Sequence, residues 1–161
     1  MPGYPFTSWN RNMRAVIQRV EDCSVTVDGE VTGAISRGLL MYLGVEKNDT
    51  ERDLEYILDK TIHLRIYEDE NGKMNLSLPE TGGQILVVSQ FTLCADTRKG
   101  RRPSYNNAAD PQKAERLYRT CLDRLSELGF PPRAGIFAAK MRVTSTNAGP
   151  VTILLDSNKT F

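Results

Sequence analysis

The chain has 161 residues, of which 40% are hydrophobic and 25% charged, and its formal net charge at pH 7 is +1. These values are typical of a globular domain with a substantial core, and they exclude a global field that would draw the protein to nucleic acid or membrane. Because no run of 18 apolar residues occurs, we also expect no membrane span.

The number and spacing of the cysteines indicate the cellular compartment. Cys23, Cys94 and Cys121 are odd in number, widely spaced and without a CxxC pair, and His63 is the single histidine. This pattern argues against a disulfide framework or a metal site and predicts a cytoplasmic protein. Residues 1–12 lack the features of a signal peptide, so we interpret them as an N-terminal extension or expression remnant ahead of one domain over 13–161.

The first half of the domain begins with strands. The range 14–27 alternates, Asp28-Gly29 is a hairpin signal, and 30–35 forms the return strand. The nearly continuous apolar run 39–45 predicts a strand that is buried on both faces.

A helix is predicted next. Thr50 and Asp53 approximate a capping box, and the apolar residues that follow recur at helical spacing. His63 falls at the end of this helix, where a structural role is expected rather than a catalytic one. The range 66–78 then predicts a hairpin that turns at Asn71-Gly72.

The second half contains a central strand, a basic loop and a second helix. The strand is predicted over 84–93, and the loop carries Arg98, Lys99, Arg101 and Arg102. The helix is predicted from Asp110, which caps it, to Gly129, which ends it. The chain closes with strands over 140–146 and 151–156. These elements predict one α/β domain with largely antiparallel strands and two main helices layered on one face of the sheet.

The two C-terminal strands flank Asn147-Ala148-Gly149-Pro150-Val151-Thr152. The simplest interpretation of a Gly-Pro step between strands is a hairpin turn. The strand SQFTL is notable too, because Ser89, Gln90 and Thr92 bring polar side chains to the end of an apolar run. The basic loop is either a solvated surface or a phosphate-binding segment.

Familiar catalytic sets have little support. A Ser-His-Asp or Cys-His site would need His63, and phosphate-cradling motifs such as GxGxxG and GxxxxGK[ST] are absent. If the chain is an enzyme, general base catalysis by a side chain is not its evident strategy.

Taken together, SQFTL, the following ADTRKGRRPS and the later NAGPVT resemble the D-aminoacyl-tRNA deacylase family, as does the opening MRAVIQRV from Met13. The resemblance runs from Met13 to about Asp156. It implies a layered β/β/α sandwich and a homodimer that needs no cofactor. The implied reaction is hydrolysis of the ester between a D-amino acid and the tRNA 3′-terminal adenosine. If L-amino acids are excluded by a clash at Cβ, we also expect hydrolysis of glycyl-tRNA mischarged on other tRNAs.

The resemblance also implies site residues. Ser89, Gln90, Phe91 and Thr92 line the pocket, and Gly149-Pro150, with a cis peptide bond, reaches it from the partner subunit. A second group is implied near the substrate: Phe137 and Met141 at the terminal adenosine, and Arg98, Lys99, Arg101 and Arg102 on tRNA. Ala148 stands where the family commonly has an acidic residue, and Ala138 where glycine is common.

Several alternatives stay open. The tRNA 2′-hydroxyl is expected to assist attack, and Thr92 as nucleophile is the competing hypothesis. Two other functions are conceivable: a nucleic-acid-binding protein that uses the basic loop without catalysis, and a related deacylase with a trans Gly149-Pro150 bond that removes a small L-amino acid.

Overall fold

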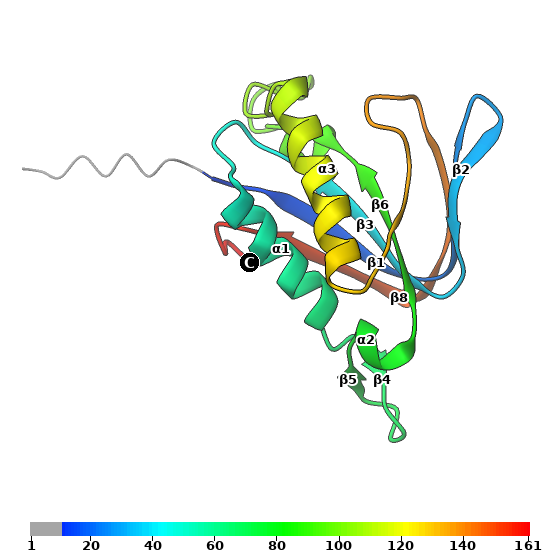
Figure 1. Cartoon of the computed structure of the whole chain (residues 1–161). Helices are drawn as coiled ribbons and strands as arrows, with labels where there is room; N and C mark the ends of the chain where they lie inside the picture. The colour runs from blue at the N-terminus through cyan, green and yellow to red at the C-terminus, as the bar shows by residue number, and fades with distance from the viewer. Residues whose placement is uncertain (1–10) are drawn as a thin grey trace, which may run out of the picture.

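Strand β1 (Arg14–Val27) organises the fold because three strands pair with it (Figure 1). Its first half pairs with β3 (Gly38–Gly44) and its second half with β2 (Glu30–Ile35), while β8 (Arg142–Asp156) runs antiparallel along its other edge. Strands β6 (Gln84–Ser89) and β7 (Arg133–Ala134) extend the sheet in parallel beyond β3. The computed structural model describes residues 11–161.

The remaining elements cover or decorate this sheet. They are helix α1 (Glu51–His63), short helix α2 (Leu78–Thr81), 3-10 helix η1 (Phe91–Cys94), helix α3 (Pro111–Glu127), and the small hairpin of β4 (Tyr67–Glu68) and β5 (Met74–Leu76). Figure 1 shows α1 and α3 on the same face of the sheet. No helix within residues 11–161 is long and apolar enough to cross a membrane.

The sheet curls so strongly that its outer strands β2 and β7 approach each other. The Thr32 hydroxyl donates to the Ala134 carbonyl at 3.4 Å. A methyl group on Gly33 would stand only 2.6 Å from that carbonyl oxygen. The close approach of β2 and β7 therefore depends on a glycine.

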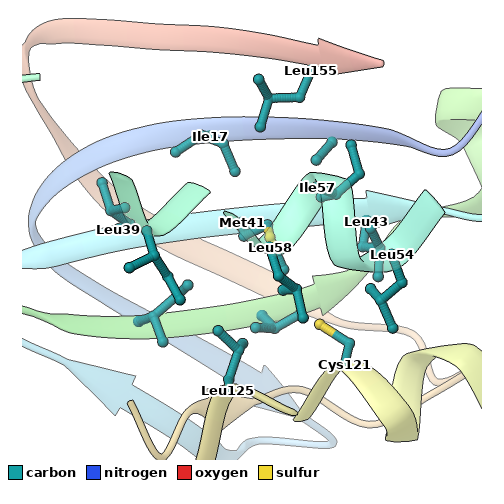
Figure 2. Close-up of a cluster of buried hydrophobic side chains, with 14 of the residues drawn as sticks. Ile17, Leu39, Met41, Leu43, Leu54, Ile57, Leu58, Cys121, Leu125 and Leu155 are labelled. Carbon is teal, nitrogen blue, oxygen red and sulfur yellow. The ribbon is translucent and has the colours of Figure 1, made fainter. Parts of the chain in front are cut away.

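Side-chain alternation along the strands creates two apolar layers. On β3, Leu39, Met41 and Leu43 join the cluster under the helices, whereas Leu40 joins a second cluster on the opposite face. Figure 2 shows the first cluster, in which side chains from α1 and α3 meet Met41 and its neighbours. The predicted β/β/α layering is confirmed.

The predicted caps are confirmed. Thr50 and Asp53 form the capping box of α1, and the Asp110 carboxylate accepts from the Lys113 amide at 2.9 Å at the start of α3. Gly129 follows α3 with φ +92°.

Two expectations about elements are wrong, and one helix was not expected. The strand predicted over 84–93 ends at Ser89, because its neighbour β3 ends at Gly44 and offers no further partner; η1 follows. Helix α2 was not expected, although Ser77 and Glu80 form a capping box for it. The two strands predicted at 140–146 and 151–156 are one strand, β8, because β1 is long enough to pair with both halves. The predicted extension covers residues 1–12, of which 1–10 lie outside the described residues.

Candidate active site

The segment Ser89–Thr92 leaves the sheet at the carboxyl end of β6. Ser89 is the last residue paired with β3, opposite Leu43, and the Gln90 amide donates to the Leu43 carbonyl at 2.8 Å. The chain then tightens into η1, where the Leu93 amide donates to the Gln90 carbonyl at 3.2 Å. The segment is therefore a fixed turn, and its side chains are not those of an alternating strand.

Two residues distant in sequence hold η1 in place. Arg14 donates from Nη1 to the Leu93 carbonyl at 3.0 Å, and its Nε lies 3.8 Å from the buried carboxylate of Asp156. Gly44 provides the space: a methyl group there would stand 2.9 Å from Leu93 Cβ and 3.0 Å from the Gln90 carbonyl oxygen. Sequence patterns did not identify either role, since each contact joins residues from separate elements.

A cavity of about 470 Å³ opens between η1, the start of α3 and the 137–143 segment. Figure 1 shows β6 ending beside the N-terminal half of α3. The cavity wall includes Ser89, Gln90 and Phe91 together with Phe137 and Met141, so these predicted residues lie together. Its other lining residues are Leu43, Val45, Val88, Ala109, Pro111, Ala114, Ala138, Ala139 and Val143. The exposed Thr92 side chain lies beside this set, and its hydroxyl accepts a hydrogen bond from the side-chain amide of Gln90.

The wall formed by 135–141 is locally constrained. Phe137 packs against Tyr118, with ring centroids 5.9 Å apart, and the Tyr118 hydroxyl donates to the Val87 carbonyl at 3.3 Å. Ala138 has φ +63°, a conformation that glycine adopts at less cost. This backbone explains why glycine suits the position. Met141 lies directly over Gly135, where any side chain would collide with its sulfur.

The cavity has no acid–base pair. Among the described residues, none that lines it carries an ionisable side chain. His63 lies elsewhere, at the end of α1, with a 66% exposed side chain and Nδ1 2.9 Å from the Asp59 carbonyl oxygen. The expectation that His63 has a structural rather than a catalytic position fits this location.

The Gly149-Pro150 step lies within β8, and its peptide bond is cis. It is therefore not a hairpin turn, which was the simplest interpretation of the local sequence, and it has the cis bond that the family resemblance implies. The register between β1 and β8 slips between Gln18 and Val20, opposite the step, so proline sits where the ladder is already interrupted. The Asn147 carboxamide oxygen accepts from the Val151 amide at 3.3 Å and bridges the step.

Arg19 of β1 anchors the residue before the step. Its Nε donates to the Ala148 carbonyl at 3.2 Å and its Nη1 to the Ile66 carbonyl at 2.7 Å, and the guanidinium lies 5.9 Å from the centre of the Tyr67 ring. Gly149 has φ +120°, and a methyl group on it would stand 2.9 Å from Arg19 Nη2. Glycine is thus required both by backbone conformation and by space.

Within one chain, the step and the cavity are far apart. Across the sheet, Asn147 pairs with Val20, Val20 pairs with Gly38, and Gly38 pairs with Gln84. Gln84 is the first residue of β6, whereas Ser89 is its last. From Asn147 to Ser89, the displacement is five residues along β6 and three strand spacings across the sheet, on the order of 20 Å. A single chain does not bring its two motifs to one site.

The basic loop projects from the same end of the molecule as the cavity. Asp96 and Ser104 exchange backbone hydrogen bonds of 2.8 and 2.9 Å, which close the exposed 97–103 segment. Arg98 folds back onto Asp96 through two hydrogen bonds, which lower the pKa of that carboxyl. Lys99, Arg101 and Arg102 are exposed.

A second cavity of about 400 Å³ lies behind η1, lined by Arg14, Glu46, Cys94 and residues of the basic loop. Glu46 is only 6% exposed, and burial raises its pKa to about 7. Burial also raises the pKa of the Cys94 thiol to about 12, so it is no nucleophile at neutral pH. This cavity contains none of the residues Ser89–Thr92, and the cavity in front of η1 is the better candidate.

Comparison with known proteins identifies relatives over the whole domain. A family model described as D-Tyr-tRNA(Tyr) deacylase matches residues 16–156. A protein of Kosmotoga olearia named D-aminoacyl-tRNA deacylase is 56% identical over 149 residues, covering 92% of this chain and 100% of the relative. A protein of the same name from Clostridioides difficile is 54% identical over 149 residues, with the same coverage of both chains.

Two solved structures share the fold. One, titled c-Myc DNA Unwinding Element Binding Protein, is 41% identical with a TM-score of 0.84, covering 88% of this chain and 97% of its own. The other is titled as a structural analysis of a probable eukaryotic D-amino acid tRNA deacylase. It has a TM-score of 0.77 at 18% identity, covering 90% of this chain and 99% of its own, and so supports the fold alone.

Proposed function

The chain belongs to the D-Tyr-tRNA(Tyr) deacylase family, and on that premise we propose that two subunits of it share each site for chiral proofreading of aminoacyl-tRNA. The chain is a hydrolase of the D-aminoacyl-tRNA ester bond. The observation that carries the shared site is the separation of Gly149-Pro150 from Ser89–Thr92 on the sheet. Phe91, Thr92 and the Gly149-Pro150 step are exposed, and a homodimer provides the simplest way to bring the two motifs together.

In this proposal the cavity in front of η1 receives the terminal adenosine. Phe137 and Met141 supply apolar surface for the base, and Gln90 and Thr92 supply polar groups at the rim. The exposed cations Lys99, Arg101 and Arg102 bind phosphates nearer the acceptor stem, since guanidinium groups suit phosphate oxygens.

Selection for D-amino acids follows from the partner's Gly149-Pro150 step. The Gly149 carbonyl accepts from the substrate α-amino group and lies so close to the α-carbon that an L side chain has no room. Arg19, by holding the neighbouring Ala148 carbonyl, fixes the backbone that makes this exclusion. The D side chain points away from the step, so its identity has little effect.

Hydrolysis needs modest assistance because the ester is already activated. The backbone amide of Gln90 already donates to the Leu43 carbonyl. The backbone amides of Phe91 and Thr92, the first two residues of η1, are therefore the donors proposed for the developing oxyanion. No described residue lining the cavity can act as a base, which favours the tRNA 2′-hydroxyl as the assisting group. Thr92 as nucleophile is disfavoured for the same reason.

The test is deacylation of D-alanyl-, glycyl- and L-alanyl-tRNA side by side over a range of enzyme concentrations. Exclusion at Cβ predicts hydrolysis of the D-alanyl substrate, slower hydrolysis of the glycyl substrate, and survival of the L-alanyl substrate. If glycyl-tRNA resists as strongly as L-alanyl-tRNA, the site must recognise a D side chain positively. Preferred hydrolysis of L-alanyl-tRNA would instead identify the related L-specific activity.

A nucleic-acid-binding role without catalysis is the second candidate, favoured by the exposed basic loop. Binding of tRNA without hydrolysis of any of the three substrates would establish it. A translation substrate and three buried free cysteines both fit the cytoplasm, which we propose as the location.

A further inference from the structure

Two exposed aromatic rings stand together at the rim of the cavity in front of η1. Phe91 is 55% exposed and Tyr105 is 39% exposed. Their ring centroids lie 5.1 Å apart with the planes at 65°, an edge-to-face pair. Phe91 also lines the cavity, so the pair extends the cavity wall outward.

The backbone holds Tyr105 between the cavity and the basic loop. Tyr105 directly follows Ser104, whose reciprocal hydrogen bonds with Asp96 close the loop. On its other side, the Tyr105 carbonyl accepts from the Ala108 amide at 3.0 Å. A strand of RNA that runs from the cations of the loop to the cavity therefore passes this ring.

We propose that Tyr105, supported by Phe91, forms a stacking platform for the unpaired nucleobase that precedes the 3′-terminal adenosine of tRNA. The inference rests on the proposed function, because it takes the terminal adenosine to occupy the cavity. Proteins bind single-stranded RNA through aromatic rings beside a cationic groove, and this surface has both features. The charge of the adjoining loop identifies the occupant. Tyr105 directly follows the closed 97–103 segment that carries the exposed Lys99, Arg101 and Arg102, so the rings and the cations complement a base and its phosphates.

The platform predicts a difference between two substrates. D-aminoacyl-adenosine, which has the ester but no preceding nucleotide, gains nothing from Tyr105, whereas D-aminoacyl-tRNA does. For Tyr105→Ala we expect kcat/KM on the tRNA substrate to fall about 5- to 150-fold, the range typical for removing one stacking ring. The value on D-aminoacyl-adenosine should stay unchanged, and Tyr105→Trp should retain activity on both. Phe161→Ala, which removes another exposed aromatic ring, is the control and should change neither.

Other outcomes overturn the inference. An equal loss on both substrates would make Tyr105 a support for the cavity wall. No loss on either would leave the ring without a role in binding. A lower mass in solution for Tyr105→Ala would assign the ring to a contact between subunits. If the wild-type protein hydrolyses neither substrate, the proposed function itself fails and the platform with it.

A second measurement detects stacking directly, through the fluorescence of the RNA. An RNA with a single-stranded 3′ end carries 2-aminopurine in place of the base that precedes a terminal adenosine. Stacking on Tyr105 should quench its emission when wild-type protein binds, and Tyr105→Ala should abolish the quenching. Bound RNA with unchanged emission would refute the platform.

Discussion

A single added methyl group tests whether the close packing of η1 against the end of β3 positions the active site. In Gly44→Ala the new Cβ would lie 2.9 Å from Leu93 Cβ, 3.0 Å from the Gln90 carbonyl oxygen and 3.3 Å from Cys94 Sγ. Ordinary contacts begin near 3.4 Å, so Leu93 must retreat by about 0.5 Å. The same movement stretches the hydrogen bond from the Gln90 amide to the Leu43 carbonyl, now 2.8 Å.

Both stability and activity should fall. Overpacking of this kind costs about 1–3 kcal/mol. At roughly 2–4 °C per kcal/mol for a domain of this size, Tm should drop by about 2–12 °C. Because the displaced backbone belongs to Ser89–Thr92, kcat/KM for D-aminoacyl-tRNA should fall by about 10-fold or more. Thermal unfolding and a deacylation assay below the transition measure the two effects.

Gly72→Ala is the matched control. Gly72 has φ +72° but open space around it at the tip of the β4–β5 hairpin, so alanine strains the backbone by about 1 kcal/mol without touching η1. Its deacylation rate should equal that of the wild type. If Gly44→Ala is as active as Gly72→Ala, the close approach at Gly44 does not position the site.

Three further predictions concern separate parts of the molecule. Arg19→Met removes the donor to the Ala148 carbonyl, so it should reduce deacylation of D-alanyl-tRNA more than 10-fold, a loss on the scale of a misplaced catalytic backbone. A rate equal to that of the wild type would count against the anchor. Burial raises the pKa of Glu46 to about 7, so the native state binds more protons than the unfolded state between about pH 4.5 and 7, and stability should decline as pH rises through that window. Glu46→Gln should reduce this decline by on the order of 1–3 kcal/mol and leave the part that comes from Asp49, whose pKa burial raises to about 6. Urea unfolding at pH 5 and pH 8 measures the decline, and an undiminished slope in Glu46→Gln would contradict the assignment. Replacing Lys99 and Arg101 with alanine should reduce the slope of log K for tRNA against log salt by roughly 0.7–0.9 per lost phosphate contact, and an unchanged slope would make the loop a solvated surface.

Local patterns in the sequence predicted most elements, because the physics that forms them is local. Asp28 and Gly29 both adopt positive φ in the turn between β1 and β2, as the hairpin signal requires. The capping box at Thr50 and the cap at Asp110 lie where their spacing placed them.

The errors arose where a distant strand decides the outcome. SQFTL has the composition of a strand, but β6 ends at Ser89 because β3 provides no partner beyond Leu43. The Gly-Pro step looks like a turn, but β1 is long enough to pair on both sides of it, and the slipped register accommodates the missing amide.

The site was predictable only in part. Motif resemblance assigned Ser89 to the pocket and Phe137 and Met141 to the terminal adenosine, and the structure has all three on the wall of one cavity. Their roles stay a prediction. The supporting contacts were not predictable, because Arg14 and Leu93 are 79 residues apart and only the folded sheet brings them together. The contact between Tyr105 and Phe91 was likewise not predictable, because it depends on the closed basic loop.

Complementation between two variants tests whether each active site combines Ser89–Thr92 of one subunit with Gly149-Pro150 of the other. Subunits carrying Gln90→Ala and subunits carrying Gly149→Ala should each be nearly inactive as homodimers. After subunit exchange at equal concentrations, each heterodimer holds one intact site, so activity should recover to about a quarter of the wild-type value. Exchange that is proven by mass but gives no activity above the two parents would contradict the shared site.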